Sequence, residues 1–318
     1  MKTALVTGGA GFIGSHLVEE LLRLNYEVLV VDDMSLGKLE NLPKSDKLFV
    51  AGRDARIYSN VESVLSRTLG NVDVIFNLAV IPLPASLSSP KDTYDTNTTI
   101  TSSMCELVRD GYADTLVQFS SSEVYGTARC IPMDESHPFD AMTPYAASKA
   151  ASDLLVESYG RTFGIDYVIV RPFNVIGPRQ NMAEWAGVVP ATIKRCMAGE
   201  PAIVHGDGSF TRDFSYVGDI VGAAIRLYHT QGAHGRAVNV GSGVETTIEE
   251  LVVTIADLFD AGCSVVHDSE RPGDVRQMVA DTSLAMKLIG YEPKVSLDEA
   301  IEKTVAWYVR SGKSTSPA

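Results

Sequence analysis

The sequence predicts an α/β fold in which a doubly wound parallel sheet is joined to a smaller, interleaved C-terminal lobe. Three observations support this prediction. Short β-branched apolar segments alternate with longer segments of helical spacing in the first half, a pattern typical of a parallel sheet. A glycine-rich turn joins the first strand-like segment to the first helical one. Beyond Pro172 this alternation ends, and glycine, proline and polar residues become frequent.

The first half supplies the predicted sheet. Ala4–Val6 and Val74–Phe76 are apolar without alternation, which is typical of strands covered by helices on both faces. Segments with helical spacing, such as Ile13–Leu24 and Tyr145–Phe163, lie between the strands. The predicted strands are Thr3–Thr7, Glu27–Val31, Val74–Leu78, Thr115–Ser120 and Tyr167–Arg171.

The second half predicts a lobe interleaved with the sheet. Glycine, proline and polar residues are frequent in Gly177–Gly187 and Gly206–Arg212, and helical spacing returns at Tyr216–His229 and Thr247–Phe259. We therefore expect a sheet domain of residues 1–174 and 216–245, and a lobe of residues 175–215 and 246–318. The last residues, Ser311–Ala318, are expected to form a frayed tail.

Composition excludes several classes of protein. The chain has 318 residues, of which 45% are hydrophobic and 21% charged, so disordered and collagen-like classes do not apply. Its 27 basic and 40 acidic residues give a net charge of −13, which disfavours nucleic acid and anionic lipid as partners. No apolar segment reaches the roughly 18–20 residues of a membrane helix. The N-terminus begins directly with a predicted strand, so we expect no secretion signal.

The four cysteines indicate a reducing compartment. Cys105, Cys130, Cys196 and Cys263 are far apart and form no Cys-x-x-Cys pair. We therefore expect a cytoplasmic protein with neither a metal site nor a disulfide framework.

The glycine-rich turn predicts a dinucleotide site. Gly8, Gly11 and Gly14 lie between the first predicted strand and helix, where glycine allows a tight turn and close approach of the backbone to a pyrophosphate. The helix N-terminus can then bind the phosphates. Asp32 lies 18 residues beyond Gly14, at the end of the second strand, as a Rossmann nucleotide-binding motif requires. Its carboxylate, followed by Asp33, would accept from ribose hydroxyls and repel a 2′-phosphate, which favours NAD over NADP.

Tyr145 and Lys149 form a candidate catalytic pair. They are four residues apart, hence on one face of a helix. We expect the Lys149 ammonium to lower the pKa of the Tyr145 phenol towards neutrality, so that the phenolate can remove a hydroxyl proton during hydride transfer. Such pairs are common on helix surfaces, but together with a dinucleotide motif the pattern indicates a dehydrogenase step.

From Lys2 to about Trp307 the chain resembles the extended short-chain dehydrogenases/reductases, specifically the nucleotide-sugar epimerases and dehydratases. The resemblance depends on ordered matches along the whole chain. They are the glycine motif, Asn77-Leu78-Ala79, Asn97, Phe119–Gly126, the Tyr–Lys pair, Arg171–Gln180, Thr211–Phe214 and Arg271–Val275.

The resemblance implies a set of site residues. Ser121 would share the substrate 4-hydroxyl with Tyr145, and Lys149 would bind the nicotinamide ribose. Asp54 would contact adenine, although Arg53 interrupts the family's usual Gly-Asp order. The implied contacts to NAD are Gly8, Gly11, Phe12, Ile13, Gly14, Asp32, Asp33, Ser35, Gly37, Asp54, Ala55, Leu78, Ala79, Asn97, Tyr145, Lys149 and Pro172. The implied contacts to the nucleotide sugar are Ser121, Glu123, Asn174, Val188, Arg212, Arg271 and Asp274, the arginines gripping a diphosphate.

Glu123 bears on which reaction follows the shared oxidation at C4. A 4-epimerase needs no further base, whereas a dehydratase needs a base for the C5 proton, which the C4 ketone acidifies. Glu123 occupies the position of the base in the 4,6-dehydratases that the chain resembles, but Ser122 stands where they have an acid. Ser121, Ser122, Glu123, Tyr145 and Lys149 are the catalytic candidates.

Several reactions fit these residues. Ser121–Glu123 resembles the Thr-Ser-Glu of UDP-glucuronate decarboxylases, whereas Arg271–Asp274 resembles epimerases. The segment Ile81–Leu87 replaces the usual 4,6-dehydratase sequence. An epimerase framework with a dehydratase base resembles the UDP-N-acetylglucosamine 5,6-dehydratases of tunicamycin-type antibiotic biosynthesis, which is the reaction we favour. A UDP-glucose or UDP-N-acetylglucosamine 4-epimerase is the main alternative. Met278, where epimerases select by size, leaves the N-acetyl group undecided.

Two further classes of protein share features of this sequence. Dinucleotide-sensing regulators share this fold, but they typically lack the Tyr–Lys pair. A reductase that exchanges its cofactor each turnover would not need diphosphate-binding arginines. Both features therefore favour a nucleotide-sugar enzyme.

A stripe of apolar residues bears on assembly. Ala150, Ala151, Leu154 and Leu155 form this stripe on one predicted helix. It either faces the chain's own sheet or forms a dimer, and the resemblance favours a homodimer.

Overall fold

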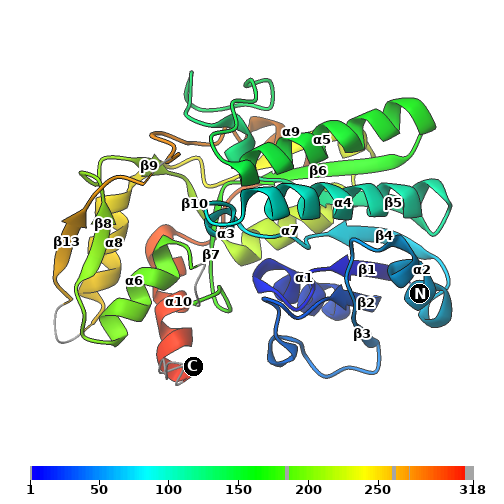
Figure 1. The fold of residues 1–318 in the computed structure, drawn as a ribbon, viewed down its shortest axis with the longest axis horizontal. Helices are drawn as coiled ribbons and strands as arrows, with labels where there is room; N and C mark the ends of the chain where they lie inside the picture. Colours follow the sequence, from blue (N-terminus) through cyan, green and yellow to red (C-terminus); the bar gives the residue numbers. More distant parts are fainter. Residues whose placement is uncertain (1, 183–185, 260–262, 272, 312–318) are drawn as a thin grey trace.

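A seven-stranded parallel sheet forms the centre of the molecule (Figure 1). The computed structural model describes residues 2–182, 186–259, 263–271 and 273–311. The strand order β11-β6-β5-β4-β1-β2-β3 reverses direction beside β1, so the predicted doubly wound α/β class is confirmed. The strands are β1 (Thr3–Thr7), β2 (Glu27–Asp32), β3 (Leu48–Gly52), β4 (Val72–Asn77), β5 (Ala113–Phe119), β6 (Asp166–Pro172) and β11 (Arg236–Val240).

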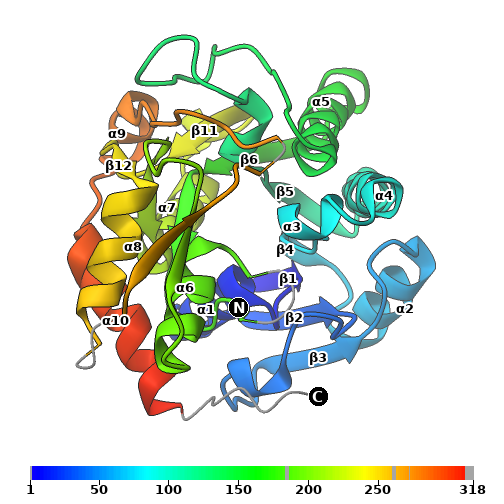
Figure 2. The same cartoon turned by 60° about the vertical axis from the view of Figure 1, so that its left-hand side comes forward.

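Helices cover both faces of the sheet (Figure 2). On one face, α1 (Phe12–Arg23) and α7 (Val217–Tyr228) bury side chains such as Leu17 and Ile220 against β1 and β4. On the other face lie α2 (Tyr58–Thr68), α4 (Pro90–Arg109) and α5 (Pro144–Phe163). Because both faces are covered, Ala4–Val6 of β1 and Val74–Phe76 of β4 are buried and apolar without alternation, as their sequences predicted.

The two edge strands, β3 and β11, were not predicted from sequence. No residue of β3 is fully buried, whereas β11 buries its last three, Val238 to Val240. An edge strand packs against fewer neighbours and needs a shorter apolar segment, so its sequence signal is weak.

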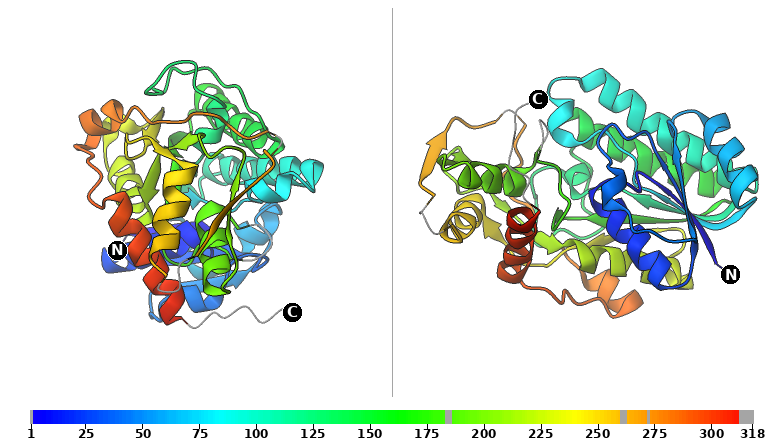
Figure 3. Two further views of the ribbon diagram at one scale, coloured as in Figure 1. Left: turned by 90° about the vertical axis from the view of Figure 1, so that its left-hand side faces the viewer. Right: turned by 90° about the horizontal axis from the view of Figure 1, so that it is seen from below.

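The lobe consists of short elements beside the carboxyl ends of the strands (Figure 1). Among its described residues, the strands form the pairs β7–β10, β9–β12 and β8–β13, and the helices are α6, α8 and α10. The right-hand view of Figure 3 shows the same separation from the sheet, with the red α10 on the lobe side. The lobe elements are β7 (Asn174–Ile176), α6 (Val188–Met197), β8 (Ala202–His205), β9 (Thr211–Arg212), β10 (Phe214–Tyr216), β12 (Thr246–Thr247), α8 (Ile248–Asp257), β13 (Val265–Asp268) and α10 (Leu297–Arg310).

One helix departs from the expected domain division. Although α9 (Ser283–Ile289) belongs to the segment assigned to the lobe, Ala285 and Tyr291 pack in the same core as α7 and β11. The remaining short elements are η1 (Leu39–Asn41), α3 (Leu83–Ser86), η2 (Ser122–Tyr125) and η3 (Gln231–Ala233). Within the described residues, no helix has the length and apolar character that crossing a bilayer requires.

The cysteine prediction was wrong for one pair. Cys196 of α6 and Cys263, just before β13, are joined as a disulfide across 67 positions of sequence, with their Cα atoms 5.3 Å apart. The parallel pairing of β8 with β13 brings the two segments together, which spacing along the chain does not reveal. Cys105 and Cys130 are free thiols.

Candidate active site

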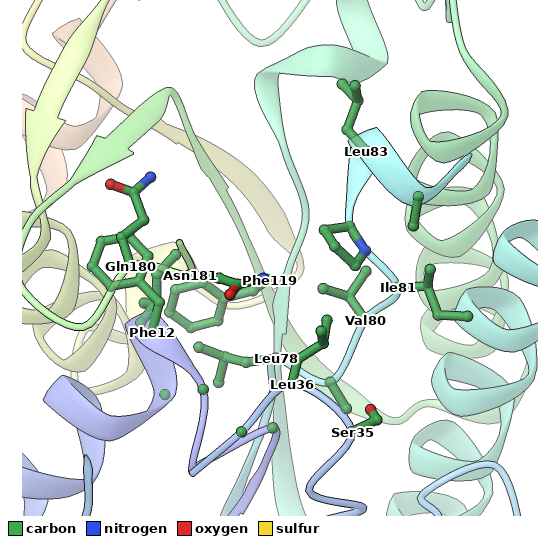
Figure 4. A pocket seen from close by; sticks show the side chains of 18 of the residues that line it. Phe12, Ser35, Leu36, Leu78, Val80, Ile81, Leu83, Phe119, Gln180 and Asn181 are labelled. Atoms are coloured by element: carbon green, nitrogen blue, oxygen red, sulfur yellow. The ribbon is translucent and has the colours of Figure 1, made fainter. Parts of the chain in front are cut away.

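A cavity of about 1420 Å³ opens at the carboxyl ends of the strands, facing the lobe. Ligands bind at this edge in doubly wound sheets because the loops that follow parallel strands meet there. Figure 4 shows Leu36, Leu78 and Phe119 lying in this cavity, each from a different strand or loop. Its lining includes the predicted residues Gly8, Gly11, Phe12, Ile13, Gly14, Asp32, Asp33, Ser35, Gly37, Asp54, Ala55, Leu78, Ala79, Ser121, Ser122, Glu123, Tyr145, Lys149, Pro172 and Asn174.

The glycine turn has room for backbone only. Gly8 has φ +66°, and a Cβ there would lie 2.8 Å from Ala79 Cα. A Cβ on Gly14 would overlap the carbonyl oxygen of Gly8. Gly11 begins α1 without a side chain to cap it, so the first N–H groups of the helix can face an anion in the cavity. The turn therefore fits a dinucleotide pyrophosphate.

Asp32 is held rigidly at the end of β2. Its carboxylate accepts hydrogen bonds from Ala10 N at 3.0 Å and Met34 N at 2.9 Å, and the residue is only 6% exposed. Burial raises its pKa, while these hydrogen bonds lower it. Beside it, Asp33 accepts from the backbone and hydroxyl of Ser35. Two carboxylates here suit a ribose with free hydroxyls and disfavour a 2′-phosphate.

Two of the expected cofactor contacts have other partners. Asp54 accepts from Arg56 Nε at 2.9 Å, and this hydrogen bond lowers its pKa. Asn97 lies outside the cavity lining: it accepts from Ile81 N at 2.8 Å and donates to the Ile81 carbonyl and the Ser148 hydroxyl. Its place is behind the wall, where it positions the segment that follows β4.

Tyr145 and Lys149 lie in the first turns of α5. Pro144 begins this helix, and the Thr143 hydroxyl caps it by accepting from Ala146 N at 3.2 Å. Lys149 Nζ donates to the Phe119 carbonyl oxygen at 2.7 Å and lies 6.0 Å from the centroid of the Tyr145 ring. The two side chains thus share one helix face, as the spacing predicted.

The expected lowering of the Tyr145 pKa is wrong for the protein alone. Burial raises the pKa of Tyr145 to about 12, with a hydrogen bond to Ser121 opposing the shift and Glu123 adding to it. Burial also lowers the pKa of Lys149 to about 8. Desolvation disfavours the charged form of both groups, and Lys149 directs its ammonium at a backbone carbonyl rather than at the phenol oxygen.

The segment after β5 places Ser121, Ser122 and Glu123 opposite Tyr145. The Ser121 hydroxyl caps η2 by accepting from Glu123 N at 3.2 Å. Ser122 is buried and Glu123 half-buried at the cavity wall. Burial raises the pKa of the Glu123 carboxyl; Arg212 lowers it and Asp274 raises it. Raising the pKa of a carboxyl makes its carboxylate a stronger base, which suits it to take a proton from carbon.

Not all of the substrate contacts predicted in the lobe reach the cavity. Asn174 lines the cavity, and its Nδ2 is buried with no hydrogen-bond partner among the described residues. Arg212 is buried close enough to Glu123 and Asp274 for their charges to act on one another. Four predicted substrate contacts, all within the described part of the chain, lie outside the cavity lining: Val188, Arg212, Arg271 and Asp274. Met278 is fully buried beside Val124 and Phe173, and it too lies outside the lining.

Several lining residues were not predicted. Lys194 of α6 and Trp307 and Tyr308 of α10 join the wall. No motif marks them, because only the packing of α6 against α10 brings them to the cavity. Val80 to Ala85 form an apolar part of the wall, where the chain departs from the usual 4,6-dehydratase sequence.

The comparisons with known proteins identify the family. A model described as GDP-mannose 4,6 dehydratase matches residues 5–304. The chain belongs to this family. The resemblance to nucleotide-sugar epimerases and dehydratases of the short-chain dehydrogenase/reductase type is thereby confirmed, and with it an enzymatic class.

Relatives of this family member differ in reaction. A UDP-glucose 4-epimerase of Mycolicibacterium smegmatis is 36% identical, over 97% of this chain and 98% of its own. UDP-glucuronic acid decarboxylase 3 of Arabidopsis thaliana is 35% identical, over 93% and 86%. The structure of TunA, an NAD-dependent NDP-hexosamine 5,6-dehydratase involved in tunicamycin biosynthesis, aligns over 99% of both chains with TM-score 0.86 and 27% identity.

Proposed function

We propose that this family member is an NAD-dependent nucleotide-sugar dehydratase that converts UDP-N-acetylglucosamine into a 5,6-unsaturated product through transient oxidation at C4. The observation that carries the proposal is Glu123, a half-buried carboxyl of raised pKa in the wall that also holds Ser121 and Tyr145. Epimerisation at C4 needs no such base, whereas removal of the C5 proton does.

The residues at the carboxyl ends of β1 and β2 would hold NAD. The glycine turn fits its pyrophosphate, and Asp32 fits the adenosine ribose. When bound, NAD supplies a reversible acceptor for the hydrogen on C4, and the positive charge of its ring favours ionisation of a nearby phenol. That charge offers a route to ionising Tyr145, whose pKa is about 12 in the protein alone.

Tyr145 and Ser121 would act on the 4-hydroxyl. Both side chains line the cavity, and Ser121 is close enough to act on the pKa of Tyr145, so one hydroxyl of a sugar can meet both. Tyr145 removes its proton, and Ser121 orients it. Lys149, fixed by the Phe119 carbonyl, supplies an ammonium donor one helical turn away.

Glu123 would act on C5 and C6. The C4 ketone stabilises the carbanion at C5 as an enolate, so Glu123 can take the C5 proton. The same proton can then be returned to the 6-hydroxyl as it leaves as water, directly or through the Ser122 hydroxyl. A carboxyl whose pKa is raised by burial suits both steps.

A 4-epimerase is the second candidate, favoured by the 36% identical relative from M. smegmatis. It would use Tyr145, Ser121 and NAD in the same way and would turn the keto sugar over before the hydrogen returns. Glu123 would then only anchor η2 by its backbone hydrogen bond to Ser121.

Incubation of purified protein with UDP-N-acetylglucosamine, followed by mass spectrometry and proton NMR, separates the two. We expect loss of one water and new alkene signals. An unchanged mass with an altered coupling of the C4 proton would identify an epimerase and overturn the dehydratase proposal.

Glu123→Gln tests the base directly. We expect dehydration to stop while reduced nicotinamide still forms on the enzyme, since oxidation at C4 does not need Glu123. Glu302→Gln, the same change on the exposed face of α10, is the matched control and should leave the product yield unchanged. Normal product formation by Glu123→Gln would reduce Glu123 to a structural role.

We also propose that the enzyme is a homodimer. The paired helices α4 and α5 expose apolar side chains, with Leu154 56%, Phe163 53% and Tyr94 41% exposed. In the predicted stripe, Ala150 is buried and Leu154 faces outward. Sedimentation velocity of the wild type and Leu154→Glu tests the dimer; a monomeric wild type would refute it.

A further inference from the structure

A buried ion pair lies behind the catalytic side chains. Arg171 of β6 donates from Nε to Asp153 Oδ2 of α5 at 2.9 Å, and the two side chains are only 3% and 0% exposed. Desolvating such a pair costs about as much as its attraction returns, so it is weak evidence for stability. Its connections to the site are more informative.

The first connection of the ion pair, through Arg171, is to the segment that carries Ser121 and Glu123. Arg171 Nη1 donates to Tyr125 Oη at 2.8 Å, and Tyr125 Oη donates to Asn239 Oδ1 at 2.7 Å. Tyr125 is the last residue of η2. The guanidinium also lies 5.3 Å from the centroid of the Tyr125 ring, so charge and hydrogen bonding fix the same side chain.

The second connection of the ion pair, through Asp153, is to Lys149. Asp153 follows Lys149 by one turn of α5, and both side chains are buried. Lys149 is buried, and burial lowers its pKa to about 8, with Asp153 opposing the shift. Asp153 is therefore the negative charge that keeps a buried lysine protonated near neutral pH.

The other groups around Lys149 do not replace Asp153. On α5, Tyr145 lies near Lys149, and the charge that acts on Lys149 is that of Asp153, which is paired with Arg171 of β6. From β5 comes the Phe119 carbonyl. Toward α4, Ser148 and Ser152 bond the uncharged Asn97 and Thr101.

We propose that Asp153 and Arg171 are positioning residues, whose buried pair holds Lys149 charged and the segment 121–126 in place, so that both halves of the catalytic machinery depend on one guanidinium. The inference rests on the proposed function in so far as Lys149, Ser121 and Glu123 act on substrate. Its first test needs no turnover.

The first test is the titration of Lys149 by NMR of ¹⁵N-lysine-labelled protein, with the Nζ signal assigned by Lys149→Met. We expect the Lys149 midpoint to fall by about one pH unit or more in Asp153→Asn, because the opposite charge is lost and Arg171 is left to repel. Asp153→Glu should restore it. An unchanged midpoint in folded Asp153→Asn would overturn the proposal.

A double variant covers the case in which Asp153→Asn does not fold because Arg171 is left buried and unpaired. Asp153→Asn/Arg171→Gln removes both charges together, and we expect a smaller downward shift, because Asp153 is the nearer charge. No shift in the double variant would count against the proposal equally.

Kinetic measurements separate the connection to Lys149 from the connection to the segment 121–126. In Asp153→Asn the alkaline limb of the kcat profile should move to lower pH with the Lys149 midpoint. In Tyr125→Phe the midpoint should stay, while kcat falls about tenfold with little change in KM, as for the loss of about 1.4 kcal/mol of positioning. A Tyr125→Phe enzyme with full kcat would refute the connection from Arg171 to the segment 121–126. A wild type inactive on every nucleotide sugar would refute the proposed function but leave the titration decisive.

Discussion

The two walls of the cavity are built differently. On the sheet side, Gly8, Asp32 and Ser121 each follow or end a buried parallel strand, so the backbone hydrogen bonds of the sheet place them. On the lobe side, Asn174 lies in a strand of only three residues. Lys194 and Trp307 come from α6 and α10, which are far apart in sequence. A local motif therefore determines position beside the sheet, whereas packing between distant segments determines it in the lobe.

Tyr145→Phe should have the largest effect on activity. Loss of the phenol oxygen should lower turnover about 10²–10⁴-fold with NAD still bound, because the sheet wall is intact. Steady-state kinetics and cofactor content measure both. Tyr94→Phe, an exposed tyrosine of α4, should behave as wild type. Residual turnover within about tenfold of wild type would remove Tyr145 from the chemistry.

The disulfide tests how far the lobe depends on distant contacts. Cys196→Ser should destabilise the oxidised protein by about 2–4 kcal/mol, since the bond closes a long loop. Thermal unfolding with and without reductant measures this, and Cys130→Ser, an exposed free thiol, is the control. Alkylation of all four cysteines in unreduced, denatured protein would show that the bond does not form.

Gly14→Ala tests the sheet wall. The added methyl group would overlap the Gly8 carbonyl oxygen, so we expect a loss of about 1–3 kcal/mol of stability together with weaker NAD binding. Gly222→Ala in α7 is the matched control, because nothing lies within 4 Å of its added Cβ. Equal NAD affinity in the two variants would show that the turn does not hold the cofactor.

Asn174→Ala should have the smallest effect, and it tests whether a residue of the lobe wall acts on substrate rather than on stability. Its Nδ2 has no partner among the described residues, so its removal should leave Tm unchanged. If it donates to substrate, KM should rise about fivefold, the value of one hydrogen bond of about 1 kcal/mol. Tm and KM are measured on the same preparation; a lower Tm with unchanged KM would assign Asn174 to structure.

The errors of prediction have physical causes that follow this contrast. The pKa of Tyr145 was predicted from helix spacing, which shows that Lys149 is near but not that its ammonium faces the Phe119 carbonyl or that both groups are buried. Distance in sequence separates the four cysteines, but the pairing of β8 with β13 brings two of them together. In each case the deciding contact joins residues far apart in sequence.

Local sequence was sufficient to predict the α/β class, the glycine turn, Asp32 and the Tyr145–Lys149 face, because these depend on residues within one or two turns or one strand of each other. Folding of the whole chain was needed to place Asn97 behind the wall and Trp307 on it, and to join Asp153 to Tyr125 through Arg171. Backbone geometry follows from neighbouring residues. Burial, and with it the charge state of Tyr145, Lys149 and Glu123, depends instead on every segment that excludes water from them.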